Sequence, residues 1–301
     1  MPGLEAKIEE MKKRRGAVVL AHNYQRGEVQ DIADFVGDSL ELARKATRVE
    51  ADVIVFCGVR FMAETAKILN MQRTVLMPDP HAGCPMADMA GVRELQEKKK
   101  TMHNPFVVSY VNTSAAVKAV SDICCTSANA VEVLKTVPAD REILFVPDKS
   151  LGAYAAARAG RTVTLWPGYC PTHHRIRARD IREKKQQHPA AKVVVHPECT
   201  EDVVALADAA ASTAGILLTC RETDAESFIV GTEIGLLHRL QKENPGKRFY
   251  AASELGDCPN MKLNTLEKIL WCLEDMQVEV TVPDAIAAAA RGAIERMLEV
   301  V

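Results

Sequence analysis

Three cysteines of this chain are each followed by proline, and this makes them the strongest candidates for metal chemistry. They are Cys84, Cys170 and Cys258, and they recur at nearly equal intervals along the 301 residues. A glycine lies one or two positions before each cysteine. The proline removes a backbone donor and favours an extended residue before it, so each thiol is predicted to lie on a fixed turn. Three such turns could bring three thiolates to one point, where they would ligate a metal ion or an iron–sulfur cluster.

Three thiolates could bind more than one kind of metal centre. Zinc could take three cysteines and keep one position free, but zinc sites usually draw two ligands from a short loop with a C-x2–4-C pattern, which this sequence lacks. A [4Fe–4S] cluster held by three cysteines has one iron without a protein ligand, and that iron could act as a Lewis acid on a substrate. Two alternatives stay open: an electron-transfer protein, which would normally supply a fourth cysteine, and a cluster-free binding protein with structural cysteines.

The remaining cysteines lie in apolar or strand-like surroundings, where a small hydrophobic side chain is the better interpretation. They are Cys57, Cys124, Cys125, Cys199, Cys220 and Cys272. The sequence shows no signal-peptide pattern and no apolar run of membrane-spanning length. We therefore expect a cytoplasmic protein in which disulfides are not formed.

The overall composition fits a soluble enzyme and excludes little else. With 48% hydrophobic and 26% charged residues, the chain can bury two or three small cores. The net charge is −2, and the basic runs at 97–100 and 182–187 contain no aromatic residues, so they are read as solvated helix ends. We predict neither nucleic-acid nor membrane partners.

Apolar runs of strand length alternate with helical stretches, a pattern typical of parallel α/β layers. One set of such strands and helices precedes each of the three Cys-Pro turns. We predict an α/β protein of three homologous Rossmann-like α/β/α domains, with parallel sheets arranged about a pseudo-threefold axis. The predicted strands are 17–24, 52–58 and 74–79 in the first set, 106–112, 122–128, 142–148 and 162–168 in the second, and 192–198, 215–220 and 248–253 in the third.

The domain boundaries are predicted from the positions of the turns. The first domain is expected to span 1–85, the second 86–171 and the third 172–282. A helix at the end of the chain begins at a proline and carries an apolar stripe. We expect this segment, 283–301, to pack back on the first domain and close the ring.

Polar side chains gather where the first strand of each set ends. His22 and Tyr24, Tyr110 and Asn112, and His196 and Glu198 occupy these ends, and Ser39, Ser127, Ser212 and Thr213 follow in later segments. In a parallel sheet, ligands bind outside the carboxyl ends of the strands, so these residues are predicted to line a site. The serines could hold a phosphate at helix N-termini, although the sequence has neither a dinucleotide-binding nor a P-loop motif.

Several longer motifs together resemble the quinolinate synthase family, and the resemblance covers essentially the whole chain. The motifs are VLAHNYQ, DSLELA, GVRFMAETAKIL, AGCPMA, YVNTSAAVKA, CTSANAV, VVVHPEC, FIVGTEIGLLHRL and CPNMKLNTLEKIL. The resemblance implies a [4Fe–4S] transferase that condenses iminoaspartate with dihydroxyacetone phosphate to quinolinate, releasing phosphate and two waters, in NAD biosynthesis. The resemblance is also compatible with a transient contact with the enzyme that produces iminoaspartate.

The resemblance also implies roles for individual residues. Cys84, Cys170 and Cys258 correspond to the cluster ligands of the family. The residues matching its substrate site are His22, Tyr24, Ser39, Tyr110, Asn112, Ser127, His196, Glu198, Ser212 and Thr213. Some members carry a CxxC-type arrangement near the third ligand, whereas this chain reads CPNM, so a regulatory disulfide is not expected there.

The reaction needs anion donors, acid–base groups and one Lewis acid. We assign phosphate and carboxylate binding to the hydroxyl and amide side chains, with His22 adding positive charge. Proton transfer is assigned to Tyr24, Tyr110, His196 and Glu198, and the sequence does not divide the acid and base roles among these four. A tyrosine with a pKa near ~10 donates readily but needs a neighbour to act as a base.

Overall fold

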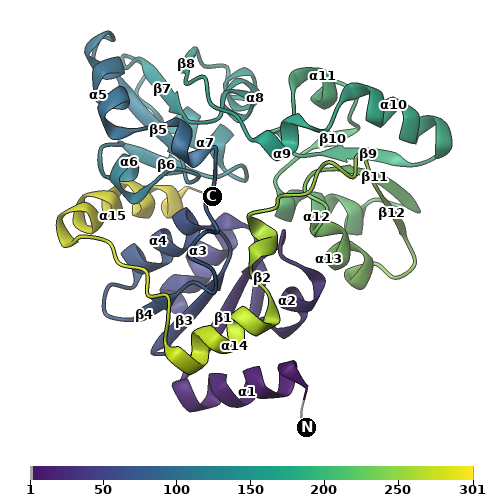
Figure 1. Ribbon diagram of the computed structural model, residues 1–301. Coiled ribbons are helices and arrows are strands. Elements are labelled where there is room, and N and C mark those ends of the chain that lie inside the picture. Colours follow the sequence, from purple (N-terminus) through teal and green to yellow (C-terminus); the bar gives the residue numbers. More distant parts are fainter. Residues whose placement is uncertain (1–2, 301) are drawn as a thin grey trace.

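The computed structural model describes residues 3–300, and it contains three four-stranded sheets in which every pair of neighbouring strands is parallel. The three units lie around a common centre (Figure 1). The sheet orders are β2-β1-β3-β4, β6-β5-β7-β8 and β10-β9-β11-β12, which is one order repeated three times. The predicted fold of three Rossmann-like units is confirmed.

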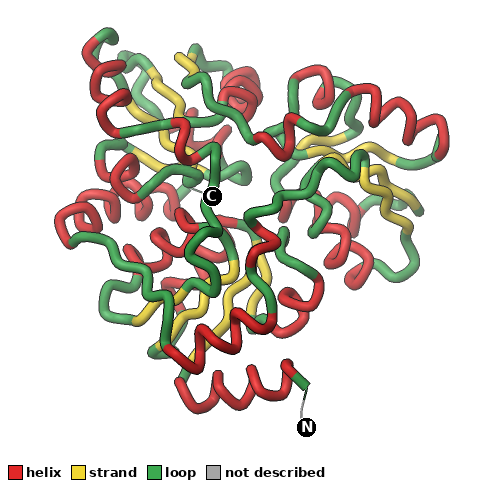
Figure 2. The backbone as a smooth tube through the Cα atoms, in the orientation of Figure 1, coloured by secondary structure: helices red, strands yellow, loops and turns green. Residues whose placement is uncertain are grey.

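In the first unit, helices cover both faces of a four-stranded sheet. Its strands are β1 (Ala17–His22), β2 (Phe35–Gly37), β3 (Val53–Cys57) and β4 (Thr74–Leu76), and its helices are α1 (Leu4–Arg15), α2 (Gly27–Ile32), α3 (Ser39–Arg48) and α4 (Arg60–Leu69). Every residue of β3 is buried. A continuous apolar strand of this kind is typical of parallel sheets covered by helices on both sides. Figure 2 shows the strands in yellow between helices in red.

The second and third units repeat this plan. The second has β5 (Phe106–Tyr110), β6 (Ile123–Cys125), β7 (Ile143–Val146) and β8 (Val163–Leu165), with α5 (Val92–Lys100), α6 (Ala115–Ala119), α7 (Ala130–Thr136), α8 (Lys149–Ala159) and the 3-10 turn η1 (Ala87–Met89). The third has β9 (Lys192–Val195), β10 (Ala209–Ala210), β11 (Ser227–Gly231) and β12 (Arg248–Ala251), with α9 (Pro171–His174), α10 (Ala178–Gln187), α11 (Glu201–Val204), α12 (Thr213–Glu222), α13 (Leu236–Glu243) and the 3-10 turn η2 (Met261–Leu263).

One aspartate in each unit makes the same contacts with the central strand. Asp34, Asp122 and Asp208 accept hydrogen bonds from the backbone N–H groups of Val19, Val107 and Val193 at 2.7, 2.8 and 2.8 Å. In all three pairs the two residues are 15 positions apart. Each aspartate N–H in turn donates to the carbonyl of the same valine. The identical arrangement supports a common architecture for units that share little sequence.

One predicted strand is wrong. Residues 215–220 belong to helix α12, and the strand of that region is β11, further along the chain. The buried residues of α12 are Thr213, Ile216, Leu217 and Cys220, which is the spacing of one helix face. Ser212 caps the helix by accepting a hydrogen bond from the N–H of Gly215. The short edge strands β2 and β10 were not predicted.

Two further helices close the ring of units. Helix α14 (Leu266–Asp275) packs against α1 and β3, although it follows the third unit in sequence. Helix α15 (Asp284–Glu299) packs against α6 and β6 of the second unit and against α4 of the first. The predicted domain boundaries at 85/86, 171/172 and 282/283 stay predictions. Residues 1–2 of the predicted first domain and residue 301 of the predicted C-terminal segment lie outside the described residues. Within residues 3–300, no helix combines the length and apolarity needed to cross a membrane.

Candidate active site

A cavity of about 120 Å³ lies where the three units meet. The carboxyl ends of the central strands and all three Cys-Pro turns contribute to its wall. Twelve of the residues predicted from the sequence line it: His22, Tyr24, Ser39, Cys84, Tyr110, Asn112, Ser127, Cys170, His196, Glu198, Thr213 and Cys258. Ser212 is absent from this lining, since its hydroxyl is used to cap α12.

The three Cys-Pro turns differ from the other cysteine positions in their exposure. Cys84, Cys170 and Cys258 are partly accessible, whereas the remaining six cysteines are buried. Asn260 joins the first and third turns, because its side-chain amide donates to the carbonyl of Gly83 at 2.8 Å. Three thiols that face one cavity fit a bound metal ion or iron–sulfur cluster as a donor set.

Burial raises the pKa of all three thiols, and that of Cys84 rises to about 12. The charge of Glu198 adds to the rise at Cys84 and Cys170. Without a cation the thiols are therefore held in their neutral form. A bound metal or cluster would supply the positive charge that makes thiolates favourable here.

Glu198 is the central carboxylate of the cavity. Its Oε1 accepts a hydrogen bond from the hydroxyl of Tyr110 at 2.6 Å, and its Oε2 lies 2.7 Å from Nδ1 of His173. Burial alone would raise the pKa of Glu198, but His173 and the hydrogen bond from the Tyr110 hydroxyl hold it well below its ordinary value. The carboxylate is therefore ionised although it is buried.

The two histidines at the strand ends are neutral. Burial lowers the pKa of His22 and of His196 to about 3. In each ring Nδ1 accepts a backbone hydrogen bond at 3.2 Å, from Tyr24 and Glu198 respectively. Nε2 of each ring therefore carries the proton, and that of His196 lies 3.1 Å from the hydroxyl of Ser127. The expectation that His22 adds positive charge is wrong, because desolvation outweighs its attraction to Glu198.

A chain of hydrogen bonds connects Tyr24 to Glu198. The Tyr24 hydroxyl lies 2.7 Å from the hydroxyl of Thr232, which lies 2.9 Å from Nε2 of His173. The other ring nitrogen of His173 faces Glu198. Burial raises the pKa of both Tyr24 and Tyr110 well above the ordinary value, so both hydroxyls keep their protons.

Sequence reasoning missed His173 and Thr232. A usable signal existed for His173, which follows Cys170 by one helical turn on α9. Thr232 follows β11, the strand that the sequence analysis had placed elsewhere, so its position at a strand end was not recognised.

The predicted anion-binding residues occupy helix starts and one loop. Ser39 and Thr213 are the first residues of α3 and α12, and Thr213 accepts a hydrogen bond from Asn23 at 3.2 Å. Asn112 has a buried side-chain oxygen without a hydrogen-bond partner among the described residues. A polar atom left unpaired in this way is available to a ligand.

A buried ion pair connects the third Cys-Pro turn to the loop after β1. Glu233 accepts hydrogen bonds from the N–H of Cys258 at 3.0 Å and from Nζ of Lys262 at 2.8 Å. Lys262 also donates to the carbonyl of Tyr24 at 2.5 Å. The positions of Cys258 and Tyr24 are thus coupled through two side chains that the sequence analysis did not select.

Comparison with known proteins decides the family. A family profile described as "Quinolinate synthetase A protein" matches residues 6–299. The chain belongs to the quinolinate synthase family. "Quinolinate synthase" of Dehalococcoides mccartyi (strain CBDB1) is 56% identical over 295 residues, covering 98% of this chain and 97% of that protein.

Relatives from other lineages match over the same length. "Quinolinate synthase" of Desulforudis audaxviator is 55% identical, with 98% and 97% coverage, and "Quinolinate synthase 1" of Methanosarcina acetivorans is 52% identical, with 98% and 96% coverage. The resemblance found in the sequence motifs is therefore confirmed.

Proposed function

We propose that this chain is a quinolinate synthase. In this proposal it condenses iminoaspartate with dihydroxyacetone phosphate to form quinolinate, releases phosphate and two waters, and so supplies the pyridine ring for NAD biosynthesis. The observation that carries the proposal is the cavity, where three Cys-Pro turns and a buried acid–base network face one space. Membership of the family supports the same reaction.

The bound group in this proposal is a [4Fe–4S] cluster held by Cys84, Cys170 and Cys258. The three accessible thiols fit it, and no fourth cysteine lines the cavity within residues 3–300. When bound, such a cluster would supply an open iron that assists the departure of hydroxyl groups.

The side chains of the cavity handle protons and orient the substrates. Tyr24 and Tyr110 are protonated and donate, and Glu198 is ionised and accepts. His173 and Thr232 lie between Tyr24 and Glu198, so a proton can pass from one to the other along hydrogen bonds.

Substrate anions are bound by neutral donors. Ser39, Ser127 and Thr213 present hydroxyls, and Nε2 of His196 carries a proton, whereas the Asn112 amide offers both a donor and a free acceptor. The low-dielectric cavity strengthens each of these hydrogen bonds, and Arg175, which also lines the cavity, adds a positive charge.

Further parts of the proposal rest on the family alone. The enzyme is placed in the transferase class and in the cytoplasm. Its partners are the two small-molecule substrates, with a transient contact to the enzyme that supplies iminoaspartate.

The proposal is tested by anaerobic purification, iron and sulfide analysis, and chromatographic detection of quinolinate after both substrates are supplied. Glu198→Gln keeps the shape but removes the charge, and it is expected to lower turnover by roughly 100-fold or more. Tyr250→Phe is the matched control, since Tyr250 stacks on His188 away from the cavity. Cluster-loaded protein that forms no quinolinate would contradict the proposal.

A further inference from the structure

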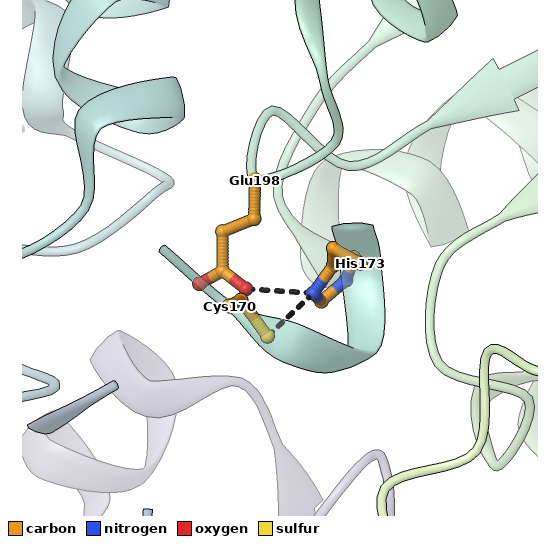
Figure 3. A group of neighbouring side chains, drawn as sticks. All are labelled: Cys170, His173 and Glu198. Carbon is orange, nitrogen blue, oxygen red and sulfur yellow. Dashed lines mark hydrogen bonds and ion pairs between the residues drawn. The ribbon is translucent and has the colours of Figure 1, made fainter. Parts of the chain in front are cut away.

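Cys170, His173 and Glu198 form a compact group of one sulfur, one nitrogen and one oxygen donor (Figure 3). These three ligand atoms lie within 4.8 Å of one another. Nδ1 of His173 is 3.1 Å from the sulfur of Cys170 and 2.7 Å from Oε2 of Glu198. The side chains of His173 and Glu198 are only 2% and 4% exposed.

Two neighbouring hydroxyls orient this group. Thr232 engages Nε2 of His173 at 2.9 Å, and Tyr110 donates to Oε1 of Glu198 at 2.6 Å. The histidine and the carboxylate therefore each have their outer polar atom occupied, while Nδ1 and Oε2 face each other beside the sulfur. Metal-binding histidines and carboxylates are held by outer hydrogen bonds of this kind.

We propose that the chain without its cluster binds one zinc ion through Cys170, His173 and Glu198. Zinc accepts thiolate, imidazole and carboxylate ligands together, and water would complete a tetrahedral set. The thiol releases its proton as the zinc–sulfur bond forms, and the thiolate and carboxylate charges then balance the ion. Zinc–ligand bonds of roughly 2.0–2.3 Å put neighbouring ligand atoms roughly 3.3–3.7 Å apart, so the distances from Nδ1 to Oε2 and to the sulfur each widen by well under 1 Å.

Zinc and cluster exclude one another in this proposal, because both need the sulfur of Cys170. The zinc site also takes Glu198 out of proton transfer. The inference goes beyond the proposed function, and it can fail independently, since it concerns the cluster-free chain and a different donor set.

The competing arrangement is zinc bound by the three Cys-Pro thiols, and the two arrangements differ in sulfur count. One equivalent of zinc chloride is added anaerobically to the full-length, cluster-free chain, and bound zinc is measured after dialysis. X-ray absorption at the zinc edge is expected to report one sulfur and otherwise nitrogen or oxygen ligands. Three sulfur ligands, or no retained zinc, would overturn the proposal.

The zinc affinities of single variants also test whether Cys170, His173 and Glu198 are the ligands. His173→Ala is expected to weaken zinc binding by at least about 100-fold, and Thr232→Val by roughly 10–100-fold through loss of orientation. His174→Ala is the matched control, because His174 contacts Ser150 instead. Cys84→Ser should keep the zinc, whereas its loss there would favour the three-thiol site. If His173→Ala does not fold, Thr232→Val and the sulfur count in the unmodified chain still decide.

Discussion

Glu198 carries its charge in the interior because two side chains contact its two carboxylate oxygens. His173 and the Tyr110 hydroxyl offset the desolvation of the carboxylate. Buried charges persist only when they are paired in this way. His173 therefore both stabilises the charge and ends the hydrogen-bond relay that can bring a proton from Tyr24 to Glu198.

Replacing Tyr24 by Phe removes the first hydroxyl of this relay. The ring still fills its buried position, so we expect the iron content to stay unchanged while turnover falls by roughly 100–10,000-fold. The measurement combines iron analysis with the rate of quinolinate formation. Normal turnover in this variant would exclude Tyr24 from proton transfer.

The cysteines divide into two groups that substitution can separate. Cys84→Ala, Cys170→Ala and Cys258→Ala are each expected to lose the complete [4Fe–4S] cluster, because each removes one of three ligands. Cys57→Ala and Cys272→Ala should retain it, since both side chains lie in the core between strands and helices. Iron and sulfide are counted per folded chain. A complete cluster in any variant of the first group would contradict the ligand set.

The sequence predicted the parts of the site that depend on local pattern. Cys170 was identified from the adjacent proline, and His196 from its place after an apolar strand. Thr232 also follows an apolar strand but was missed because that strand was placed elsewhere, and its contact with Tyr24, 208 positions away, comes only from the folded chain. The state of His22 was also unpredictable, since its protonation depends on burial that only the assembled units create.

Among the elements, the central strands depend on the three repeated aspartates. Asp122→Ala would leave the buried N–H of Val107 without its partner, and we expect a loss of about 1–3 kcal/mol in unfolding free energy. Urea unfolding measures this loss. Asp140→Ala is the control, because Asp140 lies exposed in a loop of the same unit. Equal stability of both variants would show that the repeated contact is not stabilising.

Helix α14 is tied to the first unit by a charged pair. Asp79 and Lys268 approach to 2.5 Å; burial would raise the pKa of Asp79, but Lys268 and the N–H of His81 lower it overall. A lowered pKa in the folded state adds stability that is full above the unfolded value near ~3.9 and is lost as the pH falls through the folded-state pKa. Asp79→Asn should therefore be less stable than the parent at pH 7, by about 1 kcal/mol, and the difference should be smaller at pH 3. Urea unfolding at both pH values checks this, and a constant difference would argue against the pair.

At the scale of the whole molecule, α15 bridges two units. Its buried face includes Ala290, Ala293, Ile294 and Met297, and Arg291 donates to the carbonyl of Ile68 in the first unit. A chain that ends at residue 282 would expose the apolar surfaces of α6 and β6. We expect such a chain to unfold at lower urea and to bind a hydrophobic dye. Unfolding identical to that of the full chain would show that α15 is dispensable.

Helix α14 has a consequence for the order of synthesis. One face of the first sheet is covered by Ile8 and Met11 of α1 together with Ile269 and Leu273 of α14. At roughly 5–20 residues per second, a ribosome needs on the order of 10–40 s to pass from β4 to α14. This face of the first sheet therefore stays only partly covered while the chain of the other two units is synthesised. In the third unit, the apolar cluster within 176–252 can be completed before α14 is made.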